Sequence, residues 1–224
     1  MIERELVDRA ARNNAEWCAT VCRTHGIVGA FDPDAWTVPR RSPPLYPDAV
    51  TLRATAPPTL LDRVDAGPGA SVKDSFATLD LSGYGFAVLF EAVWIHRAPG
   101  PAPTVVRRAA RAVRTDDELA EWAATHGAGE AFRPELLADP AVTVLAIRDT
   151  DGGVAGGAVV NRTGSVVGVS NVFAVTATPD EVWSAVVARL PDVPLVGYES
   201  GADLEPAERV GFRRLGPLRV WLRD

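Results

Sequence analysis

A carboxylate, a phenol and two small polar side chains stand on strand-like segments in the second half of the sequence. Glu199 ends an apolar run, and a carboxylate at the end of a strand can act as a general base. Tyr198 precedes it and can donate a proton as a general acid. Ser170 and Asn171 interrupt the valine-rich run 166–175. We treat Glu199, Tyr198 and Ser170 as candidate catalytic residues and Asn171 as a candidate substrate contact. The alternative is that all four are polar residues of a solvated loop or a half-buried strand.

Two tryptophans and a histidine in the first half are further candidates for substrate contacts. Trp17 falls in a predicted helix over 3–25, Trp36 in a proline-rich loop over 27–48, and His96 at the end of a predicted strand. Ligand sites are frequent where domains meet, so these side chains could line a cleft between two halves of the chain. The alternative is that they are core or surface residues with no contact to a ligand.

The cysteines and the single lysine could also do chemistry. Cys18, Cys22 and His25 follow one another at helical spacing, but a structural zinc site needs four ligands and no fourth is evident. Half-buried thiols on a helix are the simpler explanation, and we expect no metal site. Lys73 is the only lysine, and a catalytic amine or a residue left by an arginine-rich composition are both open.

Composition narrows the class of protein. The chain has 224 residues, a net charge of −6, 47% hydrophobic and 23% charged residues, which is typical of a globular protein. Nucleic-acid binding requires a basic surface, so an acidic balance argues against it. No leader peptide and no apolar run of membrane-spanning length are evident. We expect a cytoplasmic protein with no nucleic-acid or membrane partner.

The first hundred residues are predicted to form an N-terminal α+β region. After the helix and the proline-rich loop, strands are expected at 49–55, 75–81 and 86–96, the last two as a hairpin around Ser82-Gly83-Tyr84-Gly85. The proline-rich stretch 98–103 can sustain neither a helix nor a central strand, so it is predicted to be a linker. The expected domains are therefore residues 1–100 and 104–224.

Residues 104–224 are predicted to alternate strands and helices. Thr115 and Glu118 have the spacing of a capping box, which predicts a helix start. Pro179 stands where proline is tolerated in the first turn of another helix. The predicted order is β-α-α-β-β-β-α-β-α-β, which indicates a mixed sheet with helices.

This order of elements, with the residues that end it, resembles the GNAT acyltransferase superfamily. In that superfamily a strand is followed by a helix ending in Gly-Phe and by a closing strand. The segments that carry the resemblance span the last half of the chain: 113–122, 194–199, 202–210, Gly211-Phe212 and 218–221. The resemblance implies an α/β (α+β) fold, a GNAT-like mixed sheet flanked by helices, with an N-terminal α+β half.

The resemblance also implies a reaction. In the family, acetyl-CoA or another acyl-CoA lies between the fourth and fifth strands, and its pyrophosphate binds N–H groups at the start of the next helix. An amine then attacks the thioester with help from a general base. Mapped onto this sequence, the donor would contact Phe173, Ala174, Val175, Thr176 and Thr178. The acceptor would be a small amine, an amino terminus or another peptide amine.

Two positions depart from the family pattern. The glycine-rich loop expected before the helix is replaced by Thr176-Ala177-Thr178-Pro179-Asp180-Glu181, which lacks glycine and adds two carboxylates. The tyrosine often found four residues before the Gly-Phe glycine is Ala207 here.

Three hypotheses follow: an acyl-CoA-dependent acyltransferase, a GNAT-fold ligand- or partner-binding module that has lost CoA binding, and an enzyme that uses another acyl donor. The sequence leaves the oligomeric state open, a homodimer included.

Overall fold

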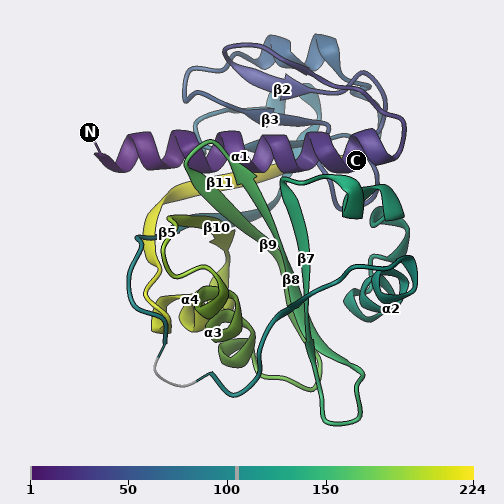
Figure 1. Cartoon of the computed structure of the whole chain (residues 1–224). Coiled ribbons are helices and arrows are strands. Elements are labelled where there is room, and N and C mark those ends of the chain that lie inside the picture. Colours follow the sequence, from purple (N-terminus) through teal and green to yellow (C-terminus); the bar gives the residue numbers. More distant parts are fainter. Residues whose placement is uncertain (1, 104–105) are drawn as a thin grey trace. The chain divides into compact units, whose positions relative to one another are not determined.

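The chain folds into two compact units, described by a computed structural model over residues 2–103 and 106–224 (Figure 1). The first unit comprises residues 1–94 with 215–224, and the second comprises residues 95–214. The division expected from the proline-rich stretch assigned 215–224 to the second part. In the structure, this last segment of the chain belongs with the N-terminal residues. Positions 104 and 105, where the second domain was expected to begin, lie outside the described residues.

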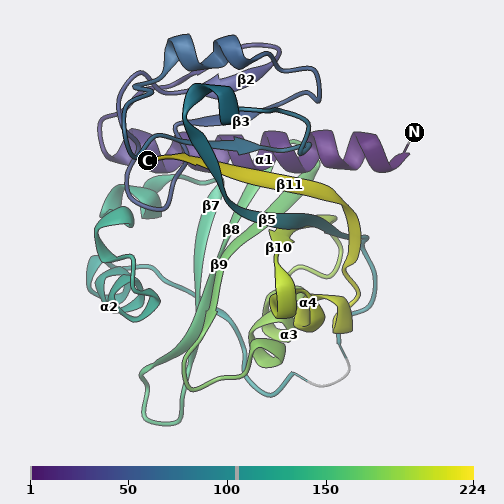
Figure 2. The ribbon, with the colours of Figure 1, turned by 180° about the vertical axis from the view of Figure 1, so that it is seen from behind.

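The first unit combines a long helix with a mixed sheet. Helix α1 runs beside strand β3, as both views show (Figures 1 and 2). The strands follow the order β1-β2-β3-β4-β11-β5, with β3 and β4 parallel. The helix and strands of this unit have these bounds: α1 Ile2–Thr24, β1 Ala30–Phe31, β2 Ala35–Thr37, β3 Ala49–Thr51, β4 Ser71–Asp74, β5 Phe86–Arg97 and β11 Arg213–Arg223. Strand β5 continues into the second unit, and β11 begins there.

The strand predicted at 75–81 is wrong, and so is its hairpin with 86–96. The carboxylate of Asp74 accepts hydrogen bonds from the amides of Phe76 (3.2 Å) and Leu79 (2.7 Å). Ala77 has a φ of 53°, which an extended strand does not allow. The aspartate therefore ends β4 and organises a turn, and residues 82–84 form a short 3-10 helix before β5.

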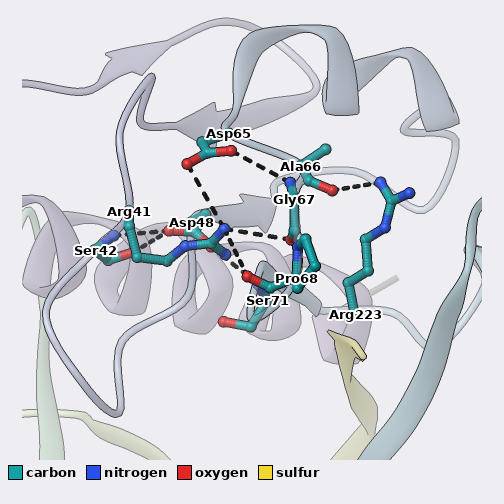
Figure 3. Close-up of polar contacts among 9 residues, drawn as sticks. All are labelled: Arg41, Ser42, Asp48, Asp65, Ala66, Gly67, Pro68, Ser71 and Arg223. Atoms are coloured by element: carbon teal, nitrogen blue, oxygen red, sulfur yellow. Dashed lines mark hydrogen bonds and ion pairs between the residues drawn. The ribbon is translucent and has the colours of Figure 1, made fainter.

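The proline-rich segment 27–48 is not a loop throughout, because it contains β1 and β2. Its later part is held by the buried carboxylate of Asp48 (Figure 3). This carboxylate accepts bonds from the amide (2.8 Å) and hydroxyl (2.6 Å) of Ser42, the amide of Ser71 (2.9 Å) and Nη1 of Arg41 (3.0 Å). Four donors around one buried carboxylate replace the water that it loses on burial. Asp48 thereby ties the segment to β4.

The second unit is built on five strands in the order β10-β9-β8-β7-β6, with β9 and β10 parallel. The end of β5 also belongs to it. The second helix was expected at 133–138, and a 3-10 helix at Pro134–Ala138 stands there, preceded by another at Gly129–Ala131. The other elements have these bounds: β6 Arg111–Ala112, α2 Asp116–His126, β7 Val142–Arg148, β8 Val154–Thr163, β9 Val166–Ala174, α3 Pro179–Arg189, β10 Leu195–Glu199 and α4 Leu204–Arg209.

Helices α2 and α3 cover opposite faces of this sheet (Figures 1 and 2). A Cβ at Gly156 would meet a methyl group of Val182 on α3, whereas a Cβ at Gly157 would meet the Trp122 indole on α2. Adjacent strand residues point to opposite faces, so the two glycines let one helix approach on each side. The capping box predicted at Thr115 is confirmed.

Both units are therefore α+β, and the mixed sheet of the second unit is flanked by helices, as the sequence predicted. In the described part of the chain, no helix has the length and apolar character needed to cross a membrane.

Candidate active site

Strands β9 and β10 of the second unit pair over a short distance. Their parallel register joins Leu195 to Val167 and Val196 to Gly168. The backbones are still close one residue further, because a Cβ at Gly197 would lie 2.8 Å from the Val169 carbonyl oxygen. Beyond this point the register gives no further pairs. The pairing of β9 with β10 therefore ends before the last residues of both strands.

A β-bulge lies in β9 immediately after the last of these pairs. Strand β8 pairs Gly157 with Phe173 and Val159 with Ser170, so three steps along β9 oppose two steps along β8. Asn171 lies within the bulge with a φ of 51°, a conformation that asparagine adopts more readily than most residues. Its Nδ2 donates to Oγ of Ser170 at 3.0 Å. The bulge brings these two predicted polar residues together and redirects their side chains.

Glu199 ends β10 where the two strands have ceased to pair. Its carboxyl group is half-buried. Burial, followed by repulsion from the Asp203 carboxylate, raises the pKa of Glu199 to about 8. An acid with this pKa takes up and releases protons near neutral pH, which is the property required of a general base. Asp203 lies in the 3-10 helix Gly201–Asp203 and was not singled out from the sequence.

The structure separates the other predicted catalytic and substrate residues. Side chains alternate along β10, so Glu199 shares a face with Gly197 and Tyr198 points to the other face. Ile95 approaches Gly197 from β5, which places His96 on the face opposite to Glu199. His96 is buried, and its Nδ1 has no hydrogen-bond partner among the described residues. Burial, with a contribution from Arg213, lowers the pKa of His96, so its ring is neutral near pH 7.

Trp17 and Trp36 belong to the first unit and are 2% and 0% exposed. Trp17 packs edge-on against Tyr46, and Trp36 lies beside Phe31. At this degree of burial, a substrate would reach either ring only after a change in packing. Their role as substrate contacts stays a prediction.

The amides between β9 and α3 already have acceptors within the chain. Those of Val175 (2.9 Å), Thr176 (3.2 Å) and Ala177 (3.1 Å) all donate to the carbonyl oxygen of Ala155 on β8. Ala155 is fully buried, which fixes the position of this acceptor. The loop therefore turns its N–H groups towards the sheet.

A capping box uses the next amides, at the start of α3. The amide of Thr178 donates to Oε2 of Glu181 (2.8 Å), and the amide of Glu181 donates to Oγ1 of Thr178 (3.3 Å). Pro179 has no N–H group, and the amide of Val182 donates to the Thr178 carbonyl (3.1 Å).

Two ion pairs surround this helix start. Nε and Nη2 of Arg209 on α4 lie 2.6 and 3.0 Å from the carboxylate of Asp180, and these bonds lower its pKa. Nε of Arg108 lies 4.0 Å from Glu181. The pKa of Glu181 is lowered first by its bond from the Thr178 amide. Both carboxylates are therefore ionised at neutral pH.

These features do not fit a pyrophosphate bound at the start of α3. An anion held there requires free N–H groups, whereas the N–H groups just described are already bonded. Of the five residues predicted to contact the donor, Phe173 packs against Trp122 and His126 on the α2 face (centroids 5.1 and 5.2 Å), and Thr178 serves as the helix cap. Ala174 pairs with Gly156. The side chain of Val175 is exposed, as is that of Thr176.

Two other sequence-predicted features belong to the first unit. Cys18 and Cys22 are free and buried, and burial raises their pKa values to about 11 and about 12, so both are thiols at neutral pH. Nζ of Lys73 donates to Oδ1 of Asn14 (2.9 Å) inside the unit. No group of three or more His, Cys, Asp or Glu side chains in the described ranges is arranged to hold a metal ion.

The fold is that of the GNAT acetyltransferases, as the comparison with solved structures shows. One similar structure is a GCN5-related N-acetyltransferase from Kribbella flavida, with 14% identity over 96% of this chain and 95% of that one, at a TM-score of 0.63. Another, from Novosphingobium aromaticivorans DSM 12444, is assigned to the GNAT acetyltransferase family, with 13% identity over 96% and 99% of the chains and a TM-score of 0.61.

A third similar structure is a conserved protein of unknown function from Staphylococcus epidermidis ATCC 12228, with 11% identity over 87% and 92% of the chains and a TM-score of 0.56. No protein-family model and no curated protein matches the chain. The resemblance seen in the last half of the sequence is thus confirmed as a likeness of fold, and the likeness extends over both units.

Proposed function

We propose that this protein is an N-acyltransferase that moves an acyl group from an activated donor, an acyl thioester, to a small amine or an amino terminus. The observation that carries the proposal is Glu199. A half-buried carboxyl group with a pKa of about 8 stands at the end of β10, where β9 and β10 part. The GNAT fold supports acyl transfer from a thioester, because the resemblance to this family implies acyl-CoA, a thioester, as the donor.

In the proposed reaction, Glu199 accepts a proton from the ammonium form of the acceptor. The freed lone pair attacks the acyl carbonyl carbon, a C–N bond forms and the C–S bond breaks. The thiolate leaves with the electron pair of that bond and takes up the second proton of the attacking nitrogen. The position of the usual family acid is occupied by buried Ala207, so we assign no protein group to this second transfer.

The test is turnover of a thioester with a panel of primary amines, followed by release of the free thiol. Glu199→Gln should lower kcat/KM by about 10²- to 10⁴-fold, the usual contribution of a general base. For the unmodified chain, kcat/KM should rise with pH and level off above about pH 8, because Glu199 must be ionised to accept the proton. Asp151→Asn, a similar change at an exposed turn, is the matched control and should leave kcat/KM unchanged. Glu199→Gln turnover within threefold of the control would refute the assignment.

A second candidate function is a binding module without catalysis. It is favoured by the bonded amides at the start of α3, which leave no evident phosphate site. Under this alternative, neither the unmodified chain nor Glu199→Gln turns over any thioester with any amine.

A further inference from the structure

We infer that the acyl donor is recognised without a nucleotide diphosphate, so that its class is a thioester with a short arm. This inference rests on the proposed acyltransferase function and names the donor of that same site. It follows from two independent features at the start of α3: the amide hydrogen bonds and the charge of the first turn.

The first feature is the direction of the loop amides. Three successive amides, those of Val175, Thr176 and Ala177, converge on the single carbonyl oxygen of Ala155. To meet a phosphate they would have to rotate away from an acceptor that is fixed in the interior of β8. Ala155 would then keep a buried carbonyl without these donors, which is costly. These three hydrogen bonds therefore favour a loop whose amides stay bonded to Ala155 over one whose amides bind a phosphate.

The capping box closes the helix start in the same way. A bound phosphate would have to displace the Glu181 carboxylate from the Thr178 amide, and the Thr178 hydroxyl from the Glu181 amide. Each exchange replaces an acceptor that is already held in place by the helix. The phosphate therefore gains little from donors that usually make a helix start attractive to anions.

The second feature is charge. A diphosphate at this position would lie beside the carboxylates of Asp180 and Glu181, both ionised at neutral pH. Arg209 could compensate, but its bidentate bonds already go to Asp180. Arg108 lies near Glu181. Arg107 also contributes to the lowered pKa of Glu181, and Nη1 of Arg108 is buried without a hydrogen-bond partner among the described residues. A dianion would thus compete with two carboxylates for these three guanidinium groups, and like charges at such short range repel.

The part of the site that remains free can hold a shorter donor. The edge of β9 from Ser170 to Ala174 has no partner in the β10 register, and Glu199 lies at the end of β10. An extended chain that contains amides can pair with such an edge through main-chain hydrogen bonds alone. A thioester with a short amide arm can make such bonds, and they do not require the nucleotide of CoA.

The experiment compares acetyl-CoA with acetyl-pantetheine and S-acetyl-N-acetylcysteamine, using the same amine acceptor. We expect the kcat/KM values of acetyl-CoA and acetyl-pantetheine to agree within about threefold. Adenosine 3′-phosphate 5′-diphosphate, the part of CoA that carries the diphosphate, should not inhibit turnover of acetyl-pantetheine at millimolar concentration. A chain that binds the diphosphate through two charge-assisted hydrogen bonds would instead prefer acetyl-CoA by about 100-fold or more, and that result would overturn the inference.

A double variant tests the role of charge. In Asp180→Asn with Glu181→Gln, Arg108 loses its carboxylate partner and Arg209 keeps only its ion pair with Glu205 (3.4 Å). The preference for acetyl-CoA over acetyl-pantetheine should then rise at least about tenfold. Asp151→Asn should leave that preference unchanged. A double variant with the original preference would overturn the charge argument. Turnover of acetyl-CoA at least 100-fold better than of the short thioesters leaves the proposed function standing and refutes the donor class, whereas no turnover of any donor refutes the function itself.

Discussion

Replacing Glu199 with glutamine should remove a large part of the pH dependence of folding stability. The pKa of this carboxyl rises from 4.5 to about 8 in the folded chain. Between these values the folded state keeps a proton that the unfolded state has lost. The unfolded state therefore binds fewer protons, and the free energy of unfolding falls as pH rises from about 4.5 and levels off above about 8.

The magnitude follows from the shift. One pKa unit corresponds to about 1.36 kcal/mol, so the free energy of unfolding should fall by about 4 kcal/mol between about pH 5 and pH 9 because of this group alone. Glutamine has nearly the same shape and does not ionise. Glu199→Gln should therefore match the unmodified chain near pH 5 and exceed its stability by several kcal/mol near pH 9.

The assay is denaturant unfolding of both chains at a series of pH values. Asp203→Asn serves as a second test, because it removes the repulsion that contributes to the shift and keeps the burial that dominates it. This variant should retain most of the pH dependence. Parallel stability curves for the unmodified chain and Glu199→Gln, separated by a constant offset, would refute the raised pKa and with it the basis for a general base.

Two further predictions concern positions that fix the architecture of each unit. Gly157→Ala should destabilise the second unit by about 2 kcal/mol or more, because its Cβ would lie 2.6 Å from a backbone carbonyl and against the Trp122 indole. Thermal unfolding would measure this, with Gly129→Ala, which meets nothing within 4 Å, as the control; equal melting temperatures would contradict the argument. Asp48→Asn should cost about 3 kcal/mol, because an amide cannot accept all four bonds of the buried carboxylate. Asp65 also forms an ion pair with Arg41, but its side chain is exposed, so Asp65→Asn should lower the free energy of unfolding by less than about 0.5 kcal/mol. A similar loss of stability in both variants would contradict the role given to the hydrogen bonds of Asp48.

Patterns of a few neighbouring residues predicted those helices and strands whose stabilising interactions lie between residues close in sequence. The capping box at Thr115 was identified from four consecutive residues, and the helix it begins is present. Strands at 142–147, 154–161 and 166–175 are predicted from β-branched residues bounded by turns, and β7, β8 and β9 agree with these bounds to within two residues. Such signals act over a few residues, so the sequence is sufficient to find them.

The errors arose where a partner is distant or a polar side chain reorganises the backbone. The segment after Asp74 has the composition of a strand, but the aspartate carboxylate binds two amides that a strand would need for pairing. The last residues of the chain follow the second unit in sequence and still belong with the first, because β11 pairs with β4. No short window of sequence carries that information.

The candidate site divides in the same way. The sequence by itself determined that Glu199 ends a strand, that polar residues interrupt β9, and that the first turn of α3 carries two carboxylates. Only the tertiary structure decided that Glu199 is half-buried beside Asp203, since burial is what raises its pKa. It also decided that the loop amides point at Ala155, because a residue on β8 supplies the acceptor. Residue type is local, whereas desolvation and hydrogen-bond partners depend on which distant segments the fold brings together.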